Sequence, residues 1–574
     1  MQLQSDTTSL AHGLLQDPGA VPLVIAVAGH RDPRPEFLPL LRQNFRIQLE
    51  SLIRTLPHTP LLMLNGLAEG MDSETAKVFL DVVAADRQRR GATTPHHQLV
   101  AALPKTPLEY RTDFDDPAAL AELERLLANC DGILHPGNCE ELRVPTSATG
   151  DTGDLDPSAC YGQQGIFLVR HCYLLFSFFD GIETRLVGGT SQTVAMQRGE
   201  IHPLFVSVEE VLATREPGAL VVHHTPRRKQ GSPLAGAGDV QFWWPGDTQQ
   251  GSGTRGLEFP DPLLVIPRRL ESLNAAAQNC PPKEYNPAEG RCTRLWSLAD
   301  QIAGKQKKSY ENWCRLLVVT GFLLVLLAQL SPVAQGLFWA LLLLAFVVFP
   351  RLQQGPKLRF IAQRCLVECL TVQHLWIALD INDDAADLFH TRSNSEMSWI
   401  RTVLRAVRIQ LLSFHSHEPR LNSSAMHKAS IWINDQVSFL TKKIRLFDQL
   451  SLQWRITALI LAAAAVALAT LGSLPGSEGL YAPWVVVLLA GFASSLAYSN
   501  LMGYADTADR YKRSLRQFQR AQAALSLLTL SASDDPRTNQ SRQKLAIEAV
   551  GREKIDELND WVAGQLQRVY APGA

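Results

Sequence analysis

The sequence of 574 residues has almost no net charge, no CxxC cysteine pair and no Walker phosphate loop. Its formal net charge of -1 gives no reason to expect binding to nucleic acid. The nine cysteines include no CxxC pair or other metal-like spacing, so no metal site is expected. No Walker phosphate loop occurs and no dinucleotide-binding fingerprint follows an expected strand, which disfavours ordinary ATP hydrolysis and dinucleotide redox chemistry.

An apolar leader is also missing, because the first twenty residues contain Asp6, His12, Gln16 and Asp17 and no apolar run. No signal peptide is therefore expected. The N-terminal region should lie in the cytoplasm, where its thiols stay reduced.

Long apolar segments are present in the second half of the chain, arranged as two close pairs. They are Leu316–Ser331, Val333–Pro350, Ile456–Gly472 and Pro483–Asn500. A helix rises about 1.5 Å per residue, so each segment covers about 24–27 Å, close to the lower limit for crossing a bilayer. The pairs predict two transmembrane helical hairpins. Buried helices of a large soluble protein are the less favoured alternative.

Positive charge flanks the outer ends of all four segments, at Lys305, Lys307, Lys308, Arg315, Arg351, Lys357, Arg359, Lys442, Lys443, Arg445, Arg455, Arg510, Lys512, Arg513 and Arg516. The turns within the pairs, at Ser331-Pro332 and at 474–482, contain no Lys or Arg. The positive-inside rule therefore places the N-terminus, the C-terminus and the region between the hairpins in the cytoplasm.

The centres of the four segments contain no Asp, Glu, Lys or Arg, so a single protomer is not expected to form a selective channel. Small residues are frequent in the third and fourth segments, at Ala462–Ala465, Gly491 and Ala493–Ser495. Small faces allow helices to approach closely. They favour a homo-oligomer, although packing within one chain gives the same pattern.

Apolar strands alternate with helical stretches in the first half of the chain. The first expected strand begins at Val21, and the others are Pro60–Asn65, Gln98–Leu103, Tyr173–Phe178 and Ile201–Val206. Continuous apolar strands are typical of a parallel sheet that is covered on both faces. The pattern predicts a doubly wound α/β domain followed by an all-α membrane region with long cytoplasmic helices.

Glycine-bearing loops follow three of these strands, at Gly29–Asp32, Gly66–Asp72 and Gly188–Gln192. Ligands of such folds bind beyond the carboxyl ends of the strands, where helix N-termini favour anions. The loops therefore predict a site for a nucleotide-like ligand. The candidate residues there and nearby are Gly29, His30, Arg31, Asp32, Gly66, Leu67, Glu69, Gly70, Asp72, Arg111, Arg170, Asp180, Gly181, Gly188, Gly189, Thr190 and Gln192.

Roles for these residues follow from their chemistry. The amides of Gly29, Gly66, Gly188 and Gly189 and the hydroxyl of Thr190 would hold phosphate. Arg31 and Arg170 would neutralise it, because Arg forms bidentate contacts with phosphate oxygens. Asp72 and Asp180 would accept ribose hydroxyls. Simpler alternatives are open: Asp32 and Asp72 as helix caps and Arg170 as a surface charge.

These motifs resemble the SLOG superfamily, the Rossmann-like group that includes the LOG phosphoribohydrolases. The resemblance covers about residues 20–225, and its closest branch is the one fused to membrane segments (TSLOG-like). It is carried by Gly-His-Arg-Asp at 29–32, Asn-Gly-Leu-Ala-Glu-Gly-Met-Asp at 65–72, Glu109–Phe114, Val169–Cys172, Asp180-Gly181, Gly188–Thr190 and Thr225–Arg227.

The C-terminal half resembles SLATT-type transmembrane effectors through Ala299-Asp300, Gly551–Glu553, Glu557, Asn559 and Trp561. SLATT members typically have one hairpin, whereas this chain has two expected hairpins. Together the resemblances imply a cytoplasmic domain that senses a nucleotide-derived signal and a membrane part that permeabilises the bacterial inner membrane.

LOG enzymes carry a catalytic glutamate after the glycine-rich loop, and Thr193 stands at that position in this chain. The nearest following acid is Glu200. Without the carboxylate the obvious catalytic group is missing, so binding without turnover is expected, with no catalytic residue and no cofactor. A membrane-anchored nucleotide-cleaving enzyme and a membrane-anchored signalling scaffold are the alternatives.

The pattern divides the chain into eight parts. They are a disordered N-terminus (1–20), the nucleotide-binding domain (21–226), a flexible linker (227–257), a helical connector (258–315), the first hairpin (316–350), a cytoplasmic helical region (351–455), the second hairpin (456–500) and C-terminal cytoplasmic helices (501–574). Long amphipathic helices are expected at Leu358–Asp380 and Glu396–Leu412, either to transmit a change in the sensor or as a structural bundle.

Overall fold

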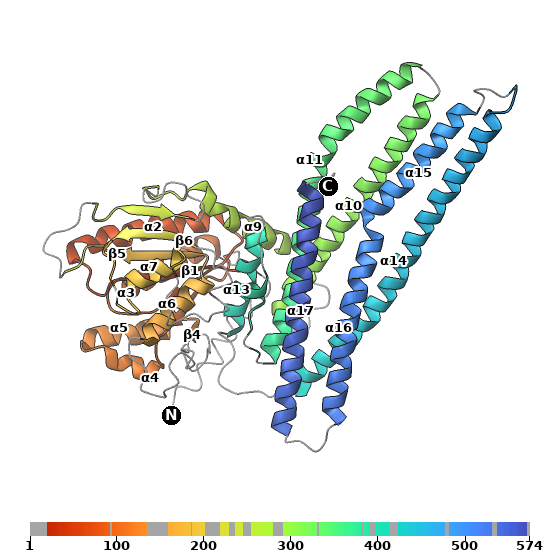
Figure 1. The fold of residues 1–574 in the computed structure, drawn as a ribbon. Helices are drawn as coiled ribbons and strands as arrows, with labels where there is room; N and C mark the ends of the chain where they lie inside the picture. The colour runs from red at the N-terminus through yellow and green to blue at the C-terminus, as the bar shows by residue number, and fades with distance from the viewer. Residues whose placement is uncertain are drawn as a thin grey trace. The chain divides into compact units, whose positions relative to one another are not determined.

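The computed structural model describes residues 20–91, 94–134, 159–184, 186–200, 218–228, 236–244, 254–278, 291–329, 332–379, 381, 383–389, 397–412, 423–476, 481–530 and 536–570. The chain forms two compact units. Unit 1 contains Met1–Leu295 and Asn394–Pro419, and unit 2 contains Trp296–Ser393 and Arg420–Ala574. Unit 1 is an α/β domain and unit 2 is helical (Figure 1).

Seven strands form one sheet in unit 1, in the order β4-β3-β2-β1-β5-β6-β7. All neighbouring strands are parallel except β6 and β7, which are antiparallel. The strands are β1 (Leu23–Gly29), β2 (Leu61–Asn65), β3 (Gln98–Ala102), β4 (Gly132–Leu134), β5 (Leu174–Phe179), β6 (Ala219–His224) and β7 (Val240–Trp243). The order along the sheet reverses between β1 and β5, which creates the switch point where ligands bind in open α/β sheets.

The first four expected strands are confirmed as β1, β2, β3 and β5, and their residues are almost completely buried. The expected strand Ile201–Val206 lies outside the described residues. A further strand, β6, ends at His223-His224, where the sequence indicates the end of a strand. Two strands were not expected: the short β4, and β7 within the segment 227–257, which was expected to be a flexible linker. In β7 the buried Val240 and Phe242 alternate with partly exposed neighbours, so this edge strand has one buried face.

Helices connect the strands and cover the sheet. They are α2 (Leu38–Thr55), α3 (Met71–Arg90), α4 (Pro107–Tyr110), α5 (Pro117–Ala128), α6 (Ala159–His171), α7 (Thr190–Gln197) and α9 (Asp261–Gln278), with one-turn helices η1 (Pro35–Phe37) and η3 (Arg111–Asp113). A later segment, α13 (Ser398–Leu412), also belongs to this unit and packs against α6 and α9. Burial of Ile400, Val403, Leu404 and Ile409 holds it in place, at about 1.5–3 kcal/mol for each large apolar side chain.

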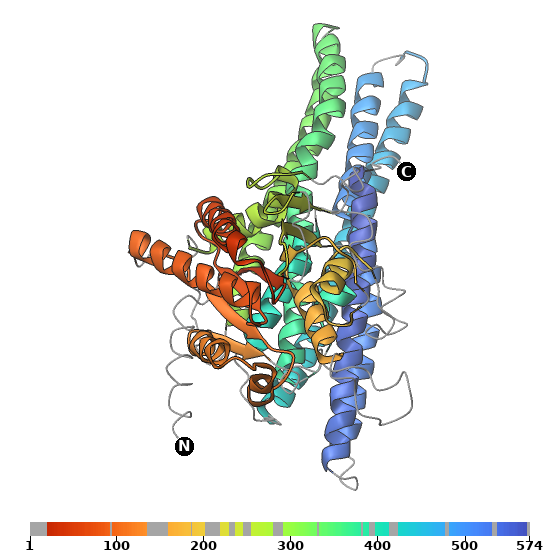
Figure 2. The same cartoon turned by 90° about the vertical axis from the view of Figure 1, so that its left-hand side faces the viewer.

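Unit 2 consists of long helices. They are α10 (Arg291–Ala328), α11 (Pro332–Ala378), the single turn α12 (Ala385–Leu388), α14 (Ser423–Gly472), α15 (Ala482–Met502), α16 (Tyr504–Leu530) and α17 (Pro536–Tyr570). Figures 1 and 2 both show α14 beside α15, and α14 also packs along α16. Helix α17 packs against α11, α12 and α16.

Three helical stretches among the described residues are long and apolar enough to cross a membrane: Leu295–Ala328, Ala429–Gly472 and Ala482–Leu528. They contain the third and fourth expected segments and residues 316–328 of the first. The second, Val333–Pro350, lies within α11, and its side chains fall outside the described residues. Apolar side chains such as Leu459 (67% exposed) and Val466 (65%) face away from the protein, as lipid-facing residues do.

Small residues allow the apolar helices to pack closely. A Cβ on Gly491 of α15 would lie 3.3 Å from Leu461 of α14 and 3.6 Å from Phe322 of α10. The hydroxyl of the buried Ser495 donates to the carbonyl of Gly491 in the same helix (2.8 Å). The small-residue face expected in the fourth segment therefore contacts two helices of its own chain.

Buried ion pairs join α11, α16 and α17. The carboxylate of Glu368 pairs with the guanidinium of Arg364 and lies 3.8 Å from Nζ of Lys554. Lys554 also pairs with Glu557 (3.2 Å), which lies 3.6 Å from Arg510. Burial alone would raise the pKa of Glu368, but these cations lower it below its ordinary value. Each charge here has an opposite partner, as buried charges require.

Candidate ligand-binding site

The loops after β1 and β2 touch each other at the carboxyl edge of the sheet, next to the switch point between β1 and β5. A Cβ on Gly29 would lie 2.5 Å from Cβ of Met71, and a Cβ on Gly70 would lie 2.5 Å from the carbonyl oxygen of Arg31. The amide of Met71 donates to the carbonyl of His30 (3.1 Å). Gly70 has a φ of 90°, which an L side chain rarely adopts. These two glycines are therefore needed for loop packing, whatever the ligand.

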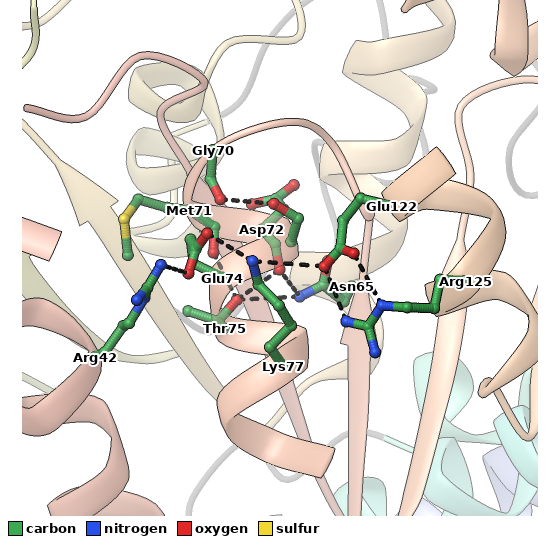
Figure 3. A network of polar contacts seen from close by, with 11 residues as sticks. Arg42, Asn65, Gly70, Met71, Asp72, Glu74, Thr75, Lys77, Glu122 and Arg125 are labelled. Atoms are coloured by element: carbon green, nitrogen blue, oxygen red, sulfur yellow. Dashed lines mark hydrogen bonds and ion pairs between the residues drawn. The ribbon is translucent and has the colours of Figure 1, made fainter. Parts of the chain in front are cut away.

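Asp72 lies at the centre of this edge, in the first turn of α3 (Figure 3). Its carboxylate oxygens face the two loops, since a Cβ on Gly29 would lie 3.2 Å from Oδ1 and a Cβ on Gly66 would lie 3.1 Å from Oδ2. Its backbone carbonyl accepts a hydrogen bond from Nδ2 of Asn65 (3.0 Å). Asp72 is only 8% exposed, and its Oδ1 has no well-aligned hydrogen bond to the described residues.

Burial raises the pKa of Asp72 to about 7, although Arg31 and the amides of Gly29 and Ala68 oppose the rise. The raised pKa means that the surrounding protein groups do not fully stabilise the ionised form of this carboxyl group. It can accept hydrogen bonds from a ligand or exchange a proton near neutral pH. The carboxylate also occupies the space between Gly29 and Gly66 where a phosphate was expected, and it would repel one.

A rim of two cations lies against the Tyr161 ring, and one of them, Arg31, also acts on the Asp72 carboxylate. The guanidinium carbon of Arg31 lies 5.4 Å from the centre of the Tyr161 ring, and Nζ of Lys105 lies 5.6 Å from the same centre. Lys105 donates to Asp113 (2.6 Å), and the Tyr161 hydroxyl donates to the other oxygen of Asp113. Burial alone would lower the pKa of Lys105, but the hydrogen bond to Asp113 raises it above its ordinary value. Both cations stay charged and suit an anionic ligand.

The third loop packs against the start of α6. Gly188 has a φ of 78°, and a Cβ there would lie 2.3 Å from Cβ of Tyr161 and 2.9 Å from the amide nitrogen of Gly162. Its amide donates to Oε1 of Gln192 (2.5 Å), so this amide is not available to phosphate. Gly189 has room around it, because the nearest atom to an added Cβ is 3.5 Å away. The backbone amides that begin α7 at Thr190 follow directly.

His30, Asp32 and Asp180 are engaged in contacts between loops. Nε2 of His30 accepts a hydrogen bond from the amide of Asp180 (3.1 Å), and burial lowers the pKa of His30 although the Asp180 carboxylate lies 3.2 Å away. Oδ1 of Asp180 accepts from the amide of Ile182, next to Gly181 at a φ of 82°. Asp32 accepts from Nε of Arg227 (2.7 Å) rather than capping a helix. These residues support the loops.

Two further candidate residues, Arg111 and Arg170, lie away from the carboxylate, whereas Glu69 and Leu67 adjoin Ala68, whose amide bonds to it. Arg111 in η3 faces Glu124 of α5 (3.4 Å), and the side chain of Glu69 is exposed. Arg170 lies at the C-terminal end of α6, just before β5 begins, and therefore at the opposite edge of the sheet from the loops. Leu67 is buried with a φ of 54°, which the Asn65 side chain supports by accepting from its amide (2.7 Å).

Three residues of the site were not expected from the sequence. Lys105 comes three residues after the end of β3, and its place at the carboxyl end of a parallel strand was a usable signal. Tyr161 and Gln164 come from the start of α6, where no motif marked them. A Cβ on Gly66 would lie 2.5 Å from Nε2 of Gln164, which donates to the carbonyl of Ala102 (2.5 Å). Gln164 thus bridges the ends of β2 and β3.

Thr193, which replaces the expected glutamate, is buried in α7 with its hydroxyl bonded to the carbonyl of Gly189 (3.3 Å). A Cβ on Gly165 of α6 would lie 2.9 Å from this hydroxyl oxygen, so Thr193 faces α6. Among the described residues, no three His, Cys, Asp or Glu side chains form a cluster that could hold a metal ion.

No protein-family model matches the sequence, and no curated protein matches it significantly.

Proposed function

We propose that this protein is a nucleotide-sensing membrane effector of a bacterial conflict or antiphage system. Binding at the SLOG-like domain would trigger permeabilisation of the inner membrane by the SLATT-like helices. The observation that carries the proposal is the incompletely bonded carboxylate of Asp72 near Arg31, at the carboxyl edge of the sheet where Lys105 also lies. It occurs in a chain that also has three apolar helical stretches long enough to cross a membrane.

The arrangement favours one orientation of the ligand. Asp72 suits a donor such as a ribose hydroxyl, because carboxylate oxygens only accept hydrogen bonds when ionised. Phosphate suits Arg31, Lys105 and the N-terminus of α7, where Gly189 leaves space for it. A ribose over β1 and β2 with its phosphate toward β5 and α7 fits these charges. The ligand is a nucleotide-derived second messenger in this proposal.

The membrane part follows the positive-inside rule, with both termini and the region between the hairpins in the cytoplasm. The exposed apolar faces of α14 and α15 support contact with lipid. Permeabilisation requires several protomers, because the segment centres carry no ionisable residue. Ligand can shift the helices only if it binds the leaky state more tightly than the resting state.

The experiment is dye release from liposomes that contain the full chain, titrated with AMP, ADP-ribose, cyclic ADP-ribose and cyclic AMP. Nucleotide-dependent release is expected, and Gly189→Glu should abolish it by placing an anion where phosphate binds. This substitution has steric room. Val265→Glu, at a 47% exposed position of α9, is the matched control and should release dye normally. Nucleotide binding without any release would instead favour the anchored scaffold.

A nucleotide-cleaving enzyme is a second candidate, favoured by the pKa of about 7 at the buried Asp72. Hydrolysis of an N-glycosidic bond adds water across that bond, and a carboxyl group with such a pKa can transfer the proton. Free base would then appear when AMP is incubated with the protein, and Asp72→Asn would stop its formation. If no base is released while the nucleotide is bound, this candidate fails.

A further inference from the structure

Helix α13 is part of unit 1 although it lies between the membrane hairpins in the sequence. It packs against α6 and α9, and none of the side chains from Met397 to Gln410 is exposed. Even the side chain of Arg408 is buried, at 4% exposure. The chain therefore leaves the helical unit after α12, contributes one helix to the α/β domain, and returns to the helical unit at α14.

Helix α6, on which α13 packs, also reaches the candidate site. The first turns of α6 carry Tyr161 and Gln164. Tyr161 contacts the third loop and the Asp113 carboxylate, and Gln164 contacts the end of β3. Helix α6 thus touches both the ligand-binding loops and α13. Packed helices transmit displacement as rigid bodies, because a close-packed interior does not deform continuously.

Both connections from α13 lead to firmly held parts of unit 2. On one side, α12 is held by Asn559 of α17, whose Nδ2 donates to the carbonyl of Leu388 (2.8 Å). Arg552 of α17 also pairs with Asp383 (2.8 Å) just before α12. On the other side, α14 is one continuous helix of 50 residues that contains the third apolar segment.

We propose that α13 is the coupling element of the protein, through which a displacement of α6 at the ligand site is passed to α12 and α14 of the membrane unit. The inference rests on the proposed function for its biological meaning. The coupling itself is a mechanical property of the fold and can be measured separately.

The direct connection between the units, 279–290, runs from α9 to α10 and offers a different route. Helix α9 is attached at the other end of the strands, where Asn274 bonds to the backbone of Val21 just before β1. Glu271 accepts from the hydroxyl of Thr59 just before β2 (2.8 Å). This helix is remote from the loops that carry Asp72. The α6–α13 route is therefore the one that begins at the site.

The experiment uses the full chain in liposomes with flexible Gly-Ser insertions. One variant carries insertions between Ser393 and Asn394 and between Pro419 and Arg420, which lengthen both connections of α13. The matched control carries an insertion of the same kind within 279–290. With the panel of AMP, ADP-ribose, cyclic ADP-ribose and cyclic AMP, the α13 variant should bind nucleotide as the wild type does. Its dye release should fall by about tenfold or more, whereas the control should release normally. Normal release from the α13 variant would overturn the proposal.

A second measurement needs no ligand. Gly165→Ala displaces α6, because the added Cβ would lie 2.9 Å from Thr193 Oγ1 and 3.1 Å from Met196 Cε of α7. Hydrogen exchange at the start of α14 should change in the otherwise wild-type chain and not in the α13 insertion variant. An unchanged rate in both chains, or the same change in both, would refute the coupling. If the exchange result holds but no nucleotide causes dye release, the coupling stands and the proposed function fails.

Discussion

Gly188→Ala should destabilise the candidate site, whereas Gly189→Ala, one residue later, should be tolerated. Gly188 has a φ of 78°, and a Cβ there would overlap Cβ of Tyr161 at 2.3 Å and the amide nitrogen of Gly162 at 2.9 Å. Neither atom can move without moving α6. Gly189 has a φ of -79°, and a Cβ there meets only ordinary contacts at 3.5 Å or more.

The magnitude follows from two terms. An L residue in the left-handed region costs about 1–2 kcal/mol. Overpacking against a fixed neighbour costs about 1–3 kcal/mol. Gly188→Ala should therefore lower the free energy of unfolding of this region by about 2–5 kcal/mol, and Gly189→Ala should change it by about 0.5 kcal/mol or less, as most unstrained surface substitutions do.

The assay is urea-dependent hydrogen exchange of the full chain, followed in peptides from α6 and α7. The free energy of opening of these peptides should drop in Gly188→Ala and stay near the wild-type value in Gly189→Ala. Nucleotide binding should weaken in Gly188→Ala because Tyr161 and α6 shift. Equal stability of the two variants would refute the close approach of the third loop to α6.

Three further predictions follow from buried groups and from the flanking charges. Asp72→Asn should stabilise the protein by about 2–3 kcal/mol more at pH 8 than at pH 5 in thermal or urea unfolding. The reason is that the pKa of Asp72 is raised to about 7 in the folded state, so the wild-type protein loses stability as the pH rises from 4 to 7. A gain that does not depend on pH would contradict this. Gly551→Ala should destabilise unit 2 by about 1–3 kcal/mol, because the new Cβ would lie 2.6 Å from the buried indole of Trp376. Its control, Gly564→Ala in the same helix, has open space and should stabilise by about 0.5–1 kcal/mol in the same unfolding assay. A cysteine introduced in the turn 474–482 should react with a membrane-impermeant maleimide from the periplasmic side, and labelling only after lysis would show that the positive-inside orientation is wrong.

The sheet could be predicted from the sequence because its strands are continuous apolar runs with a glycine or polar turn after them. β1 and β5 are examples, since each is buried along almost its whole length. β4 has only three residues and no such run. β7 lies in a segment rich in Gly and Pro, where composition outweighed the short alternating pattern of Val240 and Phe242. Local patterns identify strands only when they are longer than a few residues.

The candidate site could be predicted in part for a related reason. Glycines after parallel strands meet at one edge of the sheet, so the three loops could be placed together from their spacing alone. The burial of Asp72 and the rim formed by Lys105 and Tyr161 depend on side chains far apart in the sequence. The same holds for α13, whose apolar face was expected but whose partners, α6 and α9, carry no local signal in its own sequence.

Two buried carboxylates show how the units differ. Glu368 is surrounded by Arg364 and Lys554, which lower its pKa despite burial, and this arrangement is typical of a structural ion pair. Among the described residues, Arg31 and the amides of Gly29 and Ala68 favour the charged form of Asp72, but burial outweighs them and raises its pKa to about 7. A protein gains nothing in stability from such an incompletely compensated charge. Its retention is explained if a ligand supplies the missing hydrogen-bond donors, because binding then recovers the cost of burial and stabilises the bound form.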